Sequence, residues 1–564
     1  MKRHLGFIFL LFAAVGGYSQ TPTPIPVPET VVVPPVAESF RSDDRDLPNL
    51  ERVGVDAMDQ RPLTKQEAIE LALENNKDIE VARKTHSIAG WDLKAARGIY
   101  QPRLSGQTFY DHTTTPNVSI FSNNRTTTVG TLAGNAGVIA PLPRFGTIFS
   151  ANLQSSRVTT DNPISILSPQ ENVALGFSLT QPLFRGRRFD AQRRTIEIAK
   201  RNYELTDTQF RQRSIESVAQ VEKAYWDLTY ALRNLQVQRD AVRDAKNQLE
   251  HNRRLVEEGQ LAPIDIVAAE TQVANFEQAV YDALNTVNLT ENLLKNLIAP
   301  NRADNIWRQS LTPVDPVEQT VPTVTLADAI DDAMQNRPEI VLNNTQKEIN
   351  KLDQRLYRDQ KKPQIDLVAS YASAGIGGGQ NPHFSPIFPS ACSTDPTSPA
   401  CQQQQANMAL LTGNPFTGVF ANRYPTFRVG LNFNIPLFGD KTAAAQLGHA
   451  KVEAERIETQ REQLEQGIQV EVRNALQAIR TAEARLRAAA IARENSERQY
   501  DSEQRKLDAG QSDVYRVLDR QTALTAAKSG ELRARTELNK AIAEFERATG
   551  TTLKVNNIET KLHH

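Results

Sequence analysis

Segments with apolar residues at every second position are followed along the 564-residue chain by segments with apolar residues at every seventh position. In residues 172–180 and 426–435, apolar and polar side chains alternate one by one, which predicts strands with one apolar and one polar face. About ten residues is also the length of a tilted strand that crosses a membrane. The segments that begin near Leu104 and Ile365 alternate less regularly. For any one of these segments taken alone, a strand of an ordinary β-sandwich is the alternative.

After each clear strand, apolar residues recur every seven positions. No Pro or Gly lies between Arg187 and Glu258, so a helix of about 72 residues and ~108 Å can form there. Alanines follow many of these apolar residues at a spacing of three, which is typical of coiled-coil helices that approach closely. The pattern comprises Val221, Leu228, Leu235, Val242, Leu249 and Val256 in the first half, and Val472, Ile479, Leu486, Tyr500 and Leu507 in the second. Similar patterns in 264–299 and 517–545 predict a returning partner for each long helix.

The order of these elements indicates an internal duplication of roughly 250 residues. The stretch "LTQPLF" at 179–184 matches "NIPLF" at 434–438, and "EEGQLAPIDIVAAETQV" around Gly259 matches "DAGQSDVYRVLDRQTAL" around Gly510. Each repeat is predicted to contain a helix, a strand, a long loop, a strand, a long helix, a tight break and a returning helix. We therefore predict a first repeat at 63–299, a hydrophilic, Pro-rich equatorial linker at 300–325, a second repeat at 326–550 and a C-terminal tail at 551–564.

The N-terminal residues have the composition of targeting and linking segments. Lys2 and Arg3 precede a short apolar run that ends in small residues, which predicts a signal peptide at 1–19. Residues 20–62 are Pro-rich and are expected to form an extended, poorly ordered arm. No later segment approaches the roughly 18–20 apolar residues of a membrane helix. The exported chain is therefore predicted to be either soluble or a β-type membrane protein.

Charge and motif content exclude several classes of function. The formal net charge is −1, so electrostatic binding of nucleic acid is not expected. The HExxH, GxSxG and Walker patterns are absent, and "GIGGG" at 375–379 is assigned to a loop, so no catalytic activity is predicted. Cys392 and Cys401 are the only cysteines. In an oxidising compartment they are predicted to close a small loop by a disulfide, with a redox or metal site as the alternative.

With these motifs in this order, the sequence resembles the TolC-like outer membrane efflux protein family over about residues 63–550. The resemblance rests on "QPLF" and "IPLF" at strand-to-helix junctions, "KAYWDL" at 223–228, the two hairpin-tip motifs and the duplication. It implies an α+β membrane protein in which long α-helical coiled-coil hairpins form a periplasmic tunnel. Four strands per protomer would contribute to a 12-stranded, trimeric transmembrane β-barrel. Whether alternating residues within 125–157 add a hairpin to the barrel or to an external loop is left open.

The same resemblance implies a passive exit duct in the cell outer membrane, with its helical tunnel in the periplasm. It would act as a homotrimer with a periplasmic adaptor (membrane fusion protein) and an inner-membrane pump, in a tripartite efflux or type I secretion system. Because the pump would supply the energy, no cofactor is expected. The alternatives are a structural periplasmic coiled-coil protein, which would not need the strands, and a periplasmic adaptor subunit, which would need one hairpin and compact β domains. The sequence determines neither the pump class nor the transported substrate.

Junction and tip residues follow where this sequence matches the family motifs. Pro182 and Pro436 mark the strand-to-helix junctions, since Pro has no N–H and suits the end of a hydrogen-bonded ladder. Gly259 and Gly510 mark the hairpin tips, where Gly favours a helix C-cap. Ser512 is expected to act as the N-cap of the second returning helix.

The resemblance also implies that the tips close the periplasmic entrance. Asp519 falls where the family carries an aspartate of the aperture, and Asp265 falls where it carries a carboxylate of the entrance latch. Arg516 stands where family members place a second aperture aspartate, while Leu507 and Ser512 replace a Tyr and an Arg of the latch. A ring of three Arg516 and three Asp519 side chains would be nearly neutral. The alternative for both aspartates is a first-turn position that the helix dipole favours.

Overall fold

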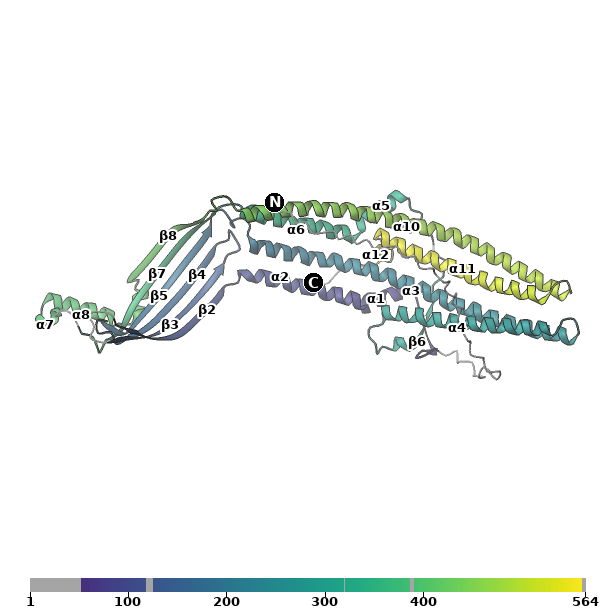
Figure 1. Ribbon diagram of the computed structural model, residues 1–564, viewed down its shortest axis with the longest axis horizontal. Coiled ribbons are helices and arrows are strands. Elements are labelled where there is room, and N and C mark those ends of the chain that lie inside the picture. Colours follow the sequence, from purple (N-terminus) through teal and green to yellow (C-terminus); the bar gives the residue numbers. More distant parts are fainter. Residues whose placement is uncertain (1–51, 118–124, 319, 386–389, 560–564) are drawn as a thin grey trace, which may run out of the picture. The chain divides into compact units, whose positions relative to one another are not determined.

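The structure is a computed structural model that describes residues 52–117, 125–318, 320–385 and 390–559 (Figure 1). All of these residues belong to one compact unit of the chain. The predicted signal peptide at 1–19 and most of the predicted arm at 20–62 lie outside the described residues. The described part combines an antiparallel sheet with bundled long helices (Figure 1).

The two repeats share two short helices, two strands and a long helical hairpin in the same order, and each also contains elements that the other lacks. The first repeat comprises α1 (Lys65–Asn75), α2 (Lys77–Arg97), a 3-10 turn at Gly98–Tyr100, β2 (Arg103–Pro116), β3 (Thr126–Pro141), β4 (Ile148–Thr160), β5 (Leu167–Pro182), α3 (Ala191–Glu257) and α4 (Ile264–Ile298). The second comprises α5 (Leu326–Asn336), α6 (Pro338–Gln360), β7 (Gln364–Gln380), α7 (Ala391–Thr394), α8 (Pro399–Leu411), α9 (Pro415–Phe420), β8 (Tyr424–Asn434), α10 (Lys441–Asp508) and α11 (Val514–Thr549). A short helix, α12 (Thr552–Val555), follows it in the C-terminal tail. The remaining elements are β1 (Asp56–Leu63), a 3-10 turn at Asn305–Trp307 and β6 (Gln309–Pro313).

The large sheet has six strands in the order β2-β3-β4-β5-β7-β8, each antiparallel to its neighbours (Figure 1). This number differs from the four strands expected per protomer, because β3 and β4 form a hairpin inserted between β2 and β5. β3 carries three glycines among its 16 residues, which weakens the alternation that would predict a strand. The "GIGGG" residues 375–379 also lie in a strand, β7, so their assignment to a loop is wrong.

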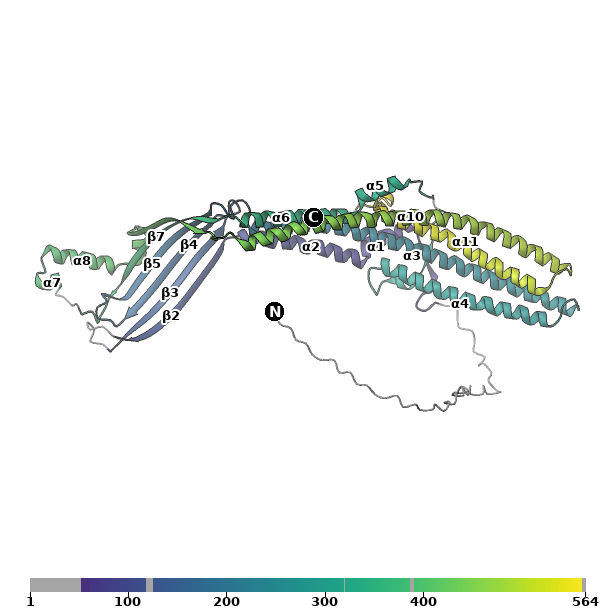
Figure 2. The same cartoon turned by 45° about the horizontal axis from the view of Figure 1, so that its top comes forward.

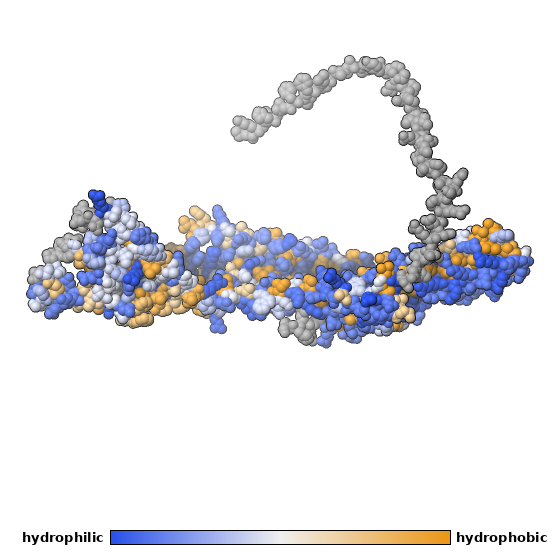
Figure 3. All heavy atoms as spheres, turned by 90° about the horizontal axis from the view of Figure 1, so that it is seen from below, coloured by the Kyte–Doolittle hydropathy of each residue, from blue (hydrophilic) through white to orange (hydrophobic). Residues whose placement is uncertain are grey.

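The pairing register gives the sheet one apolar and one polar face, because residues directly opposite one another lie on the same face. The apolar face carries Phe427, Val429, Leu431 and Phe433 of β8, Ile365, Leu367, Ala369 and Tyr371 of β7, Leu175, Phe177 and Leu179 of β5, and Phe149, Ala151 and Leu153 of β4. The polar face carries Arg428, Asn432 and Asn434 of β8, Gln364 and Asp366 of β7, Ser178 and Thr180 of β5, and Ser150, Asn152 and Gln154 of β4. A hollow of about 560 Å³, lined mainly from this polar face, draws residues from all six strands. Figure 3 shows hydrophobic residues gathered along one side of the sheet.

The long helices pack as two antiparallel pairs, α3 with α4 and α10 with α11. Figures 1 and 2 show α2 beside α3 and α6 beside α10, in agreement with their contacts. The heptad residues Val221, Leu228 and Val472 are fully buried, which confirms the predicted coiled-coil seams. Among the described residues, no helix is both long and apolar enough to cross a membrane.

Local sequence sets the helix boundaries. α3 starts four residues later than predicted, because the carboxylate of Asp190 caps it by accepting the backbone N–H of Arg193 at 2.8 Å. The first helix of the second repeat is divided into α5 and α6, because Pro338 forces the backbone of Arg337 out of the helical region. The first repeat breaks at the equivalent place without a proline, since the side chain of Asn76 caps α2.

A two-stranded parallel sheet joins β1 to β6. Residues 56–62 are therefore part of a strand and not of a poorly ordered arm. A buried charge cluster ties this sheet to α4: the Glu291 carboxylate accepts the N–H of Leu311 at 2.7 Å and pairs with Arg52 at 2.8 Å. The ammonium of Lys295 donates to the carbonyl oxygen of Gln309 at 2.6 Å, and burial lowers its pKa against the opposing pull of Glu291.

Candidate functional site

Both predicted tips are built by the same helix-ending motif. Gly259 has φ 75° and Gly510 has φ 71°, a left-handed conformation that glycine adopts without strain. The N–H of Gln260 donates to the Leu255 carbonyl at 2.8 Å, and the N–H of Gln511 donates to the Lys506 carbonyl at 2.8 Å. These are Schellman bonds, which satisfy the last carbonyls of α3 and α10. The chain can therefore reverse direction at both tips within a few residues.

The first residues of the returning helices use carboxylates to close the turns. The Asp265 carboxylate accepts the N–H of Ala262 at 3.0 Å, so within this chain it stabilises its own tip. Asp513, and not the expected Ser512, is the N-cap of α11, because it is Asp513 that accepts the N–H of Arg516, at 2.9 Å. The Ser512 hydroxyl instead contacts the carboxylate of Glu503.

The two predicted aperture residues lie on the exposed side of α11. Arg516 and Asp519 are three positions apart, so they share one side of the helix. The guanidinium of Arg516 pairs with Asp513 of its own chain, Nε to Oδ2 3.3 Å. Within the described residues, the side chain of Asp519 has no hydrogen bond or ion pair. A single chain thus leaves the Asp519 carboxylate available for contacts with other copies.

The two helical hairpins also contact each other near the tips, through residues that the sequence does not single out. Nε2 of His251 on α3 lies 3.2 Å from Oδ1 of Asp508 on α10. The Gln272 amide on α4 donates to the Thr522 hydroxyl on α11 at 2.7 Å. Heptads constrain the apolar seam within a hairpin but not polar pairs between hairpins, which is why sequence reasoning missed these contacts.

A small apolar cluster lies beneath the second tip. Leu507 is 5% exposed and packs with Val514, Val517 and Leu518, and Leu261 of the first tip packs against the same cluster. Leu507 thus serves as a core residue in this chain. Burial of Leu261 against this cluster therefore helps to hold the first tip to the second.

Charged groups on α3 and α11 meet where the repeats pack together. Lys223 pairs with Glu544, which also pairs with Arg547 at 2.6 Å. Burial, together with the nearby carboxylate of Glu222, raises the pKa of Glu546 to about 7, while the ammonium of Lys65 opposes the shift. Glu546 is therefore the one carboxylate of this group that the fold favours in its neutral form.

This raised pKa predicts how stability depends on pH. Because the folded state binds the Glu546 proton more tightly than the unfolded state does, its contribution is complete below the ordinary value of 4.5 and is lost as the pH rises through about 7. Above pH 7, we expect Glu546→Gln to raise the thermal unfolding midpoint, with a gain of at most about 3 kcal/mol in the free energy of unfolding. Below pH 4.5, the substitution should change the midpoint little.

Glu544→Gln is the matched control for this prediction. Although burial opposes the shift, hydrogen bonds from Arg547 and Lys223 lower the pKa of Glu544, so this substitution should destabilise the protein at the higher pH. If both glutamine variants shifted the midpoint in the same direction, the assignment of a neutral Glu546 would be wrong.

The strand-to-helix junctions contain the predicted prolines. Pro182 is the last residue of β5, and Pro436 lies two residues after the end of β8. The ladder with β7 extends one residue beyond Pro182, where the N–H of Leu183 donates to the Ile365 carbonyl at 2.9 Å. The two junctions contact each other through Arg185 and Asp440, with 3.7 Å between Nη1 and Oδ2.

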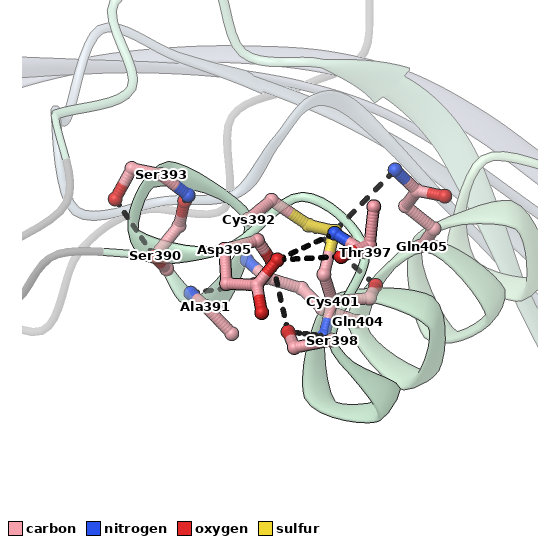
Figure 4. The surroundings of a disulfide bond; sticks show 10 residues. All are labelled: Ser390, Ala391, Cys392, Ser393, Asp395, Thr397, Ser398, Cys401, Gln404 and Gln405. Carbon is pink, nitrogen blue, oxygen red and sulfur yellow. Dashed lines mark hydrogen bonds between the residues drawn. A yellow bond between two sulfur atoms is a disulfide. The ribbon is translucent and has the colours of Figure 1, made fainter.

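The loop between β7 and β8 contains a disulfide between Cys392 and Cys401, whose Cα atoms lie 4.6 Å apart (Figure 4). The Asp395 carboxylate accepts the N–H of Thr397 at 2.9 Å and its hydroxyl at 2.8 Å, and these bonds lower the pKa of Asp395. Ser398 caps α8 by accepting the N–H of Cys401 at 3.1 Å. In the part of the chain that the structure describes, no three His, Cys, Asp or Glu side chains are grouped to hold a metal.

Comparison with protein families agrees with this architecture. A model described as outer membrane efflux protein matches residues 68–299 and 329–551, which correspond to the two repeats. The chain therefore belongs to the outer membrane efflux protein family. A search of curated protein sequences gave no significant match.

Several solved channel structures share the fold at low sequence identity. The outer-membrane channel OprN is 14% identical with a TM-score of 0.60, over 86% of this chain and 90% of that chain. The Campylobacter jejuni CmeC outer membrane channel is 15% identical with a TM-score of 0.58, over 86% of each chain. The Neisseria gonorrhoeae MtrE outer membrane channel is 16% identical with a TM-score of 0.56, over 87% of this chain and 89% of that chain. The family and the fold are those of passive channels of the outer membrane, with the helical tunnel in the periplasm.

Proposed function

We propose that three copies of this chain form a passive outer-membrane exit duct that engages a periplasmic adaptor and an inner-membrane pump, in tripartite efflux or type I secretion. The observation that carries the proposal is the two-faced sheet, whose edge strands β2 and β8 each have one partner among the described residues. In lipid, every backbone N–H and C=O must be paired, so these edges need partner strands from other copies. Three sheets of six strands would supply eighteen strands, in place of the twelve expected from the resemblance.

Fractionation and mass measurement test this proposal. The protein is expected in the outer-membrane fraction, to be released only by detergent, and to have three times the mass of one chain in the released state. Recovery of folded protein in the soluble fraction without detergent would contradict the duct, and a monomeric detergent-solubilised protein would contradict closure by three copies.

We also propose that Arg516 and Asp519 line the periplasmic aperture. In a threefold assembly each residue occurs three times around the axis, so one substitution acts three times. Asp519→Ala should remove three carboxylates from the aperture and shift the ion selectivity toward anions, whereas Arg516→Ala should remove three guanidinium groups and shift it toward cations. Because exposed ion pairs contribute only about 0–1 kcal/mol each, the shifts should be modest and should grow at low salt.

Single-channel recording in planar bilayers checks these two variants. Asp282→Ala, which removes an exposed carboxylate from the middle of α4, is the matched control and should leave conductance and selectivity unchanged. Unchanged selectivity in both the Asp519 and Arg516 variants would remove these residues from the aperture and leave them as helix-end charges.

A further inference from the structure

A basic platform lies where the sheet meets the long helices. It consists of the β3–β4 turn, residues 142–147, and the β5–α3 connection, residues 183–190. Arg144 in the turn and Arg187 and Arg188 in the connection are exposed. Large apolar side chains are exposed among them, namely Leu142 (44%), Phe145 (56%) and Phe184 (51%). The platform therefore offers cationic and apolar groups side by side.

Hydrogen bonds and a cation–π contact connect the two halves of this platform. The Arg193 guanidinium donates to the carbonyl oxygens of Pro143 at 3.2 Å and Arg187 at 2.9 Å. The Gln181 amide donates to the carbonyl of Phe145 at 3.0 Å. The Arg187 guanidinium lies over the Phe145 ring, 5.8 Å from its centroid. The arginines are thus presented by a built surface, and the inserted β3–β4 hairpin supplies one half of it.

The platform belongs to a wider asymmetry of charge between the two ends of the sheet. At the helix end, the connections 98–102, 142–147, 183–190, 361–363 and 435–440 contain six basic residues, Arg144, Arg185, Arg187, Arg188, Lys361 and Lys362, and two acidic ones, Asp190 and Asp440. Both acidic side chains are engaged as helix N-caps. At the opposite end, the connections 117–125, 161–166 and 381–423 contain two basic and two acidic residues. Positive charge is therefore concentrated at the helix end of the sheet.

We propose that this platform binds the headgroups of anionic phospholipids in the periplasmic leaflet of the outer membrane. The inference rests on the proposed membrane-spanning sheet, whose apolar face ends at these connections. Guanidinium groups match the phosphate oxygens in charge and geometry, and the exposed Phe and Leu side chains enter the boundary of the acyl chains beside them. Leu437 (92% exposed) and Phe438 (88% exposed) extend the same apolar border after β8. Anionic lipid thereby fixes the depth of the sheet in the bilayer.

Lipid binding by the full-length protein in detergent tests the proposal. Wild-type protein should bind phosphatidylglycerol more tightly than phosphatidylcholine, as measured by retained lipid in native mass spectrometry. Near a membrane surface each basic side chain contributes about a fivefold factor in affinity, so Arg144→Gln/Arg187→Gln/Arg188→Gln should weaken phosphatidylglycerol binding on the order of 100-fold. Lysine at the same three positions should retain most of the binding, because the charge is kept.

The control variant is Arg233→Gln/Arg239→Gln/Arg480→Gln, which removes the same charge from exposed positions on α3 and α10. It should keep the preference for phosphatidylglycerol. Equal loss in both glutamine triples, no loss in the platform triple, or no lipid preference in the wild type would each overturn the proposal. If the triple variant does not fold, Arg144→Gln alone, in a surface turn, should still lose about fivefold. Conductance in pure phosphatidylcholine bilayers measures duct function without anionic lipid. The duct can therefore be tested even if the lipid proposal fails.

Discussion

Trp226→Ala is expected to lower the free energy of unfolding by about 3–5 kcal/mol. Trp226 is 1% exposed and meets the ring of Tyr225 edge-on, with 5.3 Å between centroids. It belongs to the core cluster that joins α1, α3 and α4. These helices are held by many other contacts, so they cannot collapse fully into the space that the indole leaves. The thermal unfolding midpoint of the detergent-solubilised protein, followed by circular dichroism, measures this loss.

Trp91→Ala is the matched control for this substitution. Trp91 lies on α2, is 67% exposed and contacts Lys94, whose Nζ is 4.1 Å from the ring centroid. An exposed cation–π contact contributes only about 0.5–1 kcal/mol, so the midpoint should fall much less. Equal losses in the two variants would contradict the assignment of Trp226 to the core that joins the repeat's helices.

Gly375→Ala is expected to detach α9 from the sheet. Gly375 lies on the apolar face of β7, where a Cβ atom would overlap the carbonyl oxygen of Pro415 and approach the N–H of Val419 at 3.0 Å. Both obstacles are backbone atoms, so they cannot move without displacing the helix. Overpacking of this kind costs about 1–3 kcal/mol. The population of the open loop should therefore rise on the order of tenfold.

Limited trypsin digestion measures this opening. Arg423, which follows α9, is the only Lys or Arg in the connection 381–423, and its N–H donates to the Gly418 carbonyl at 2.9 Å. Cleavage after Arg423 should therefore be faster in Gly375→Ala than in the wild type. Gly430→Ala is the control, because nothing lies within 4 Å of a Cβ atom at Gly430 in β8. A cleavage rate at the wild-type level in Gly375→Ala would show that α9 is not held at this glycine.

The parts of the fold that depend on local pattern were predictable. The buried heptad residues of α3 and α10 repeat every seven positions because they all face one partner helix, and the pattern carries that information directly. The tips were equally predictable, since Gly259 and Gly510 are needed for a left-handed backbone at the helix ends. The junction prolines follow from the missing N–H of Pro, which ends a ladder.

The candidate site was predictable in position but not in its contacts. The sequence places Arg516 and Asp519 near a tip, yet only the structure shows Arg516 paired with Asp513 and Asp519 exposed. Asp513 rather than Ser512 caps α11, a choice between neighbouring cap-forming residues that pattern reasoning does not resolve. The positions of Asp513 and Asp519 can be read from the sequence, whereas the groups that they contact depend on how the turn closes.

The sequence by itself determined the duplication, the helical hairpins, the tips and the alternation of the clearest strands, because each is a periodic or local property of the chain. Only the tertiary structure decided that β3 and β4 enter the sheet, that β1 pairs with β6, and that Glu291 and Lys295 are buried on α4. Each of these depends on partners far away in sequence: small residues form a strand when neighbouring strands bond to both sides, and a charged pair is buried when distant backbone groups satisfy it. Contacts with such distant partners produce no periodic pattern in the local sequence, so the sequence alone does not reveal them.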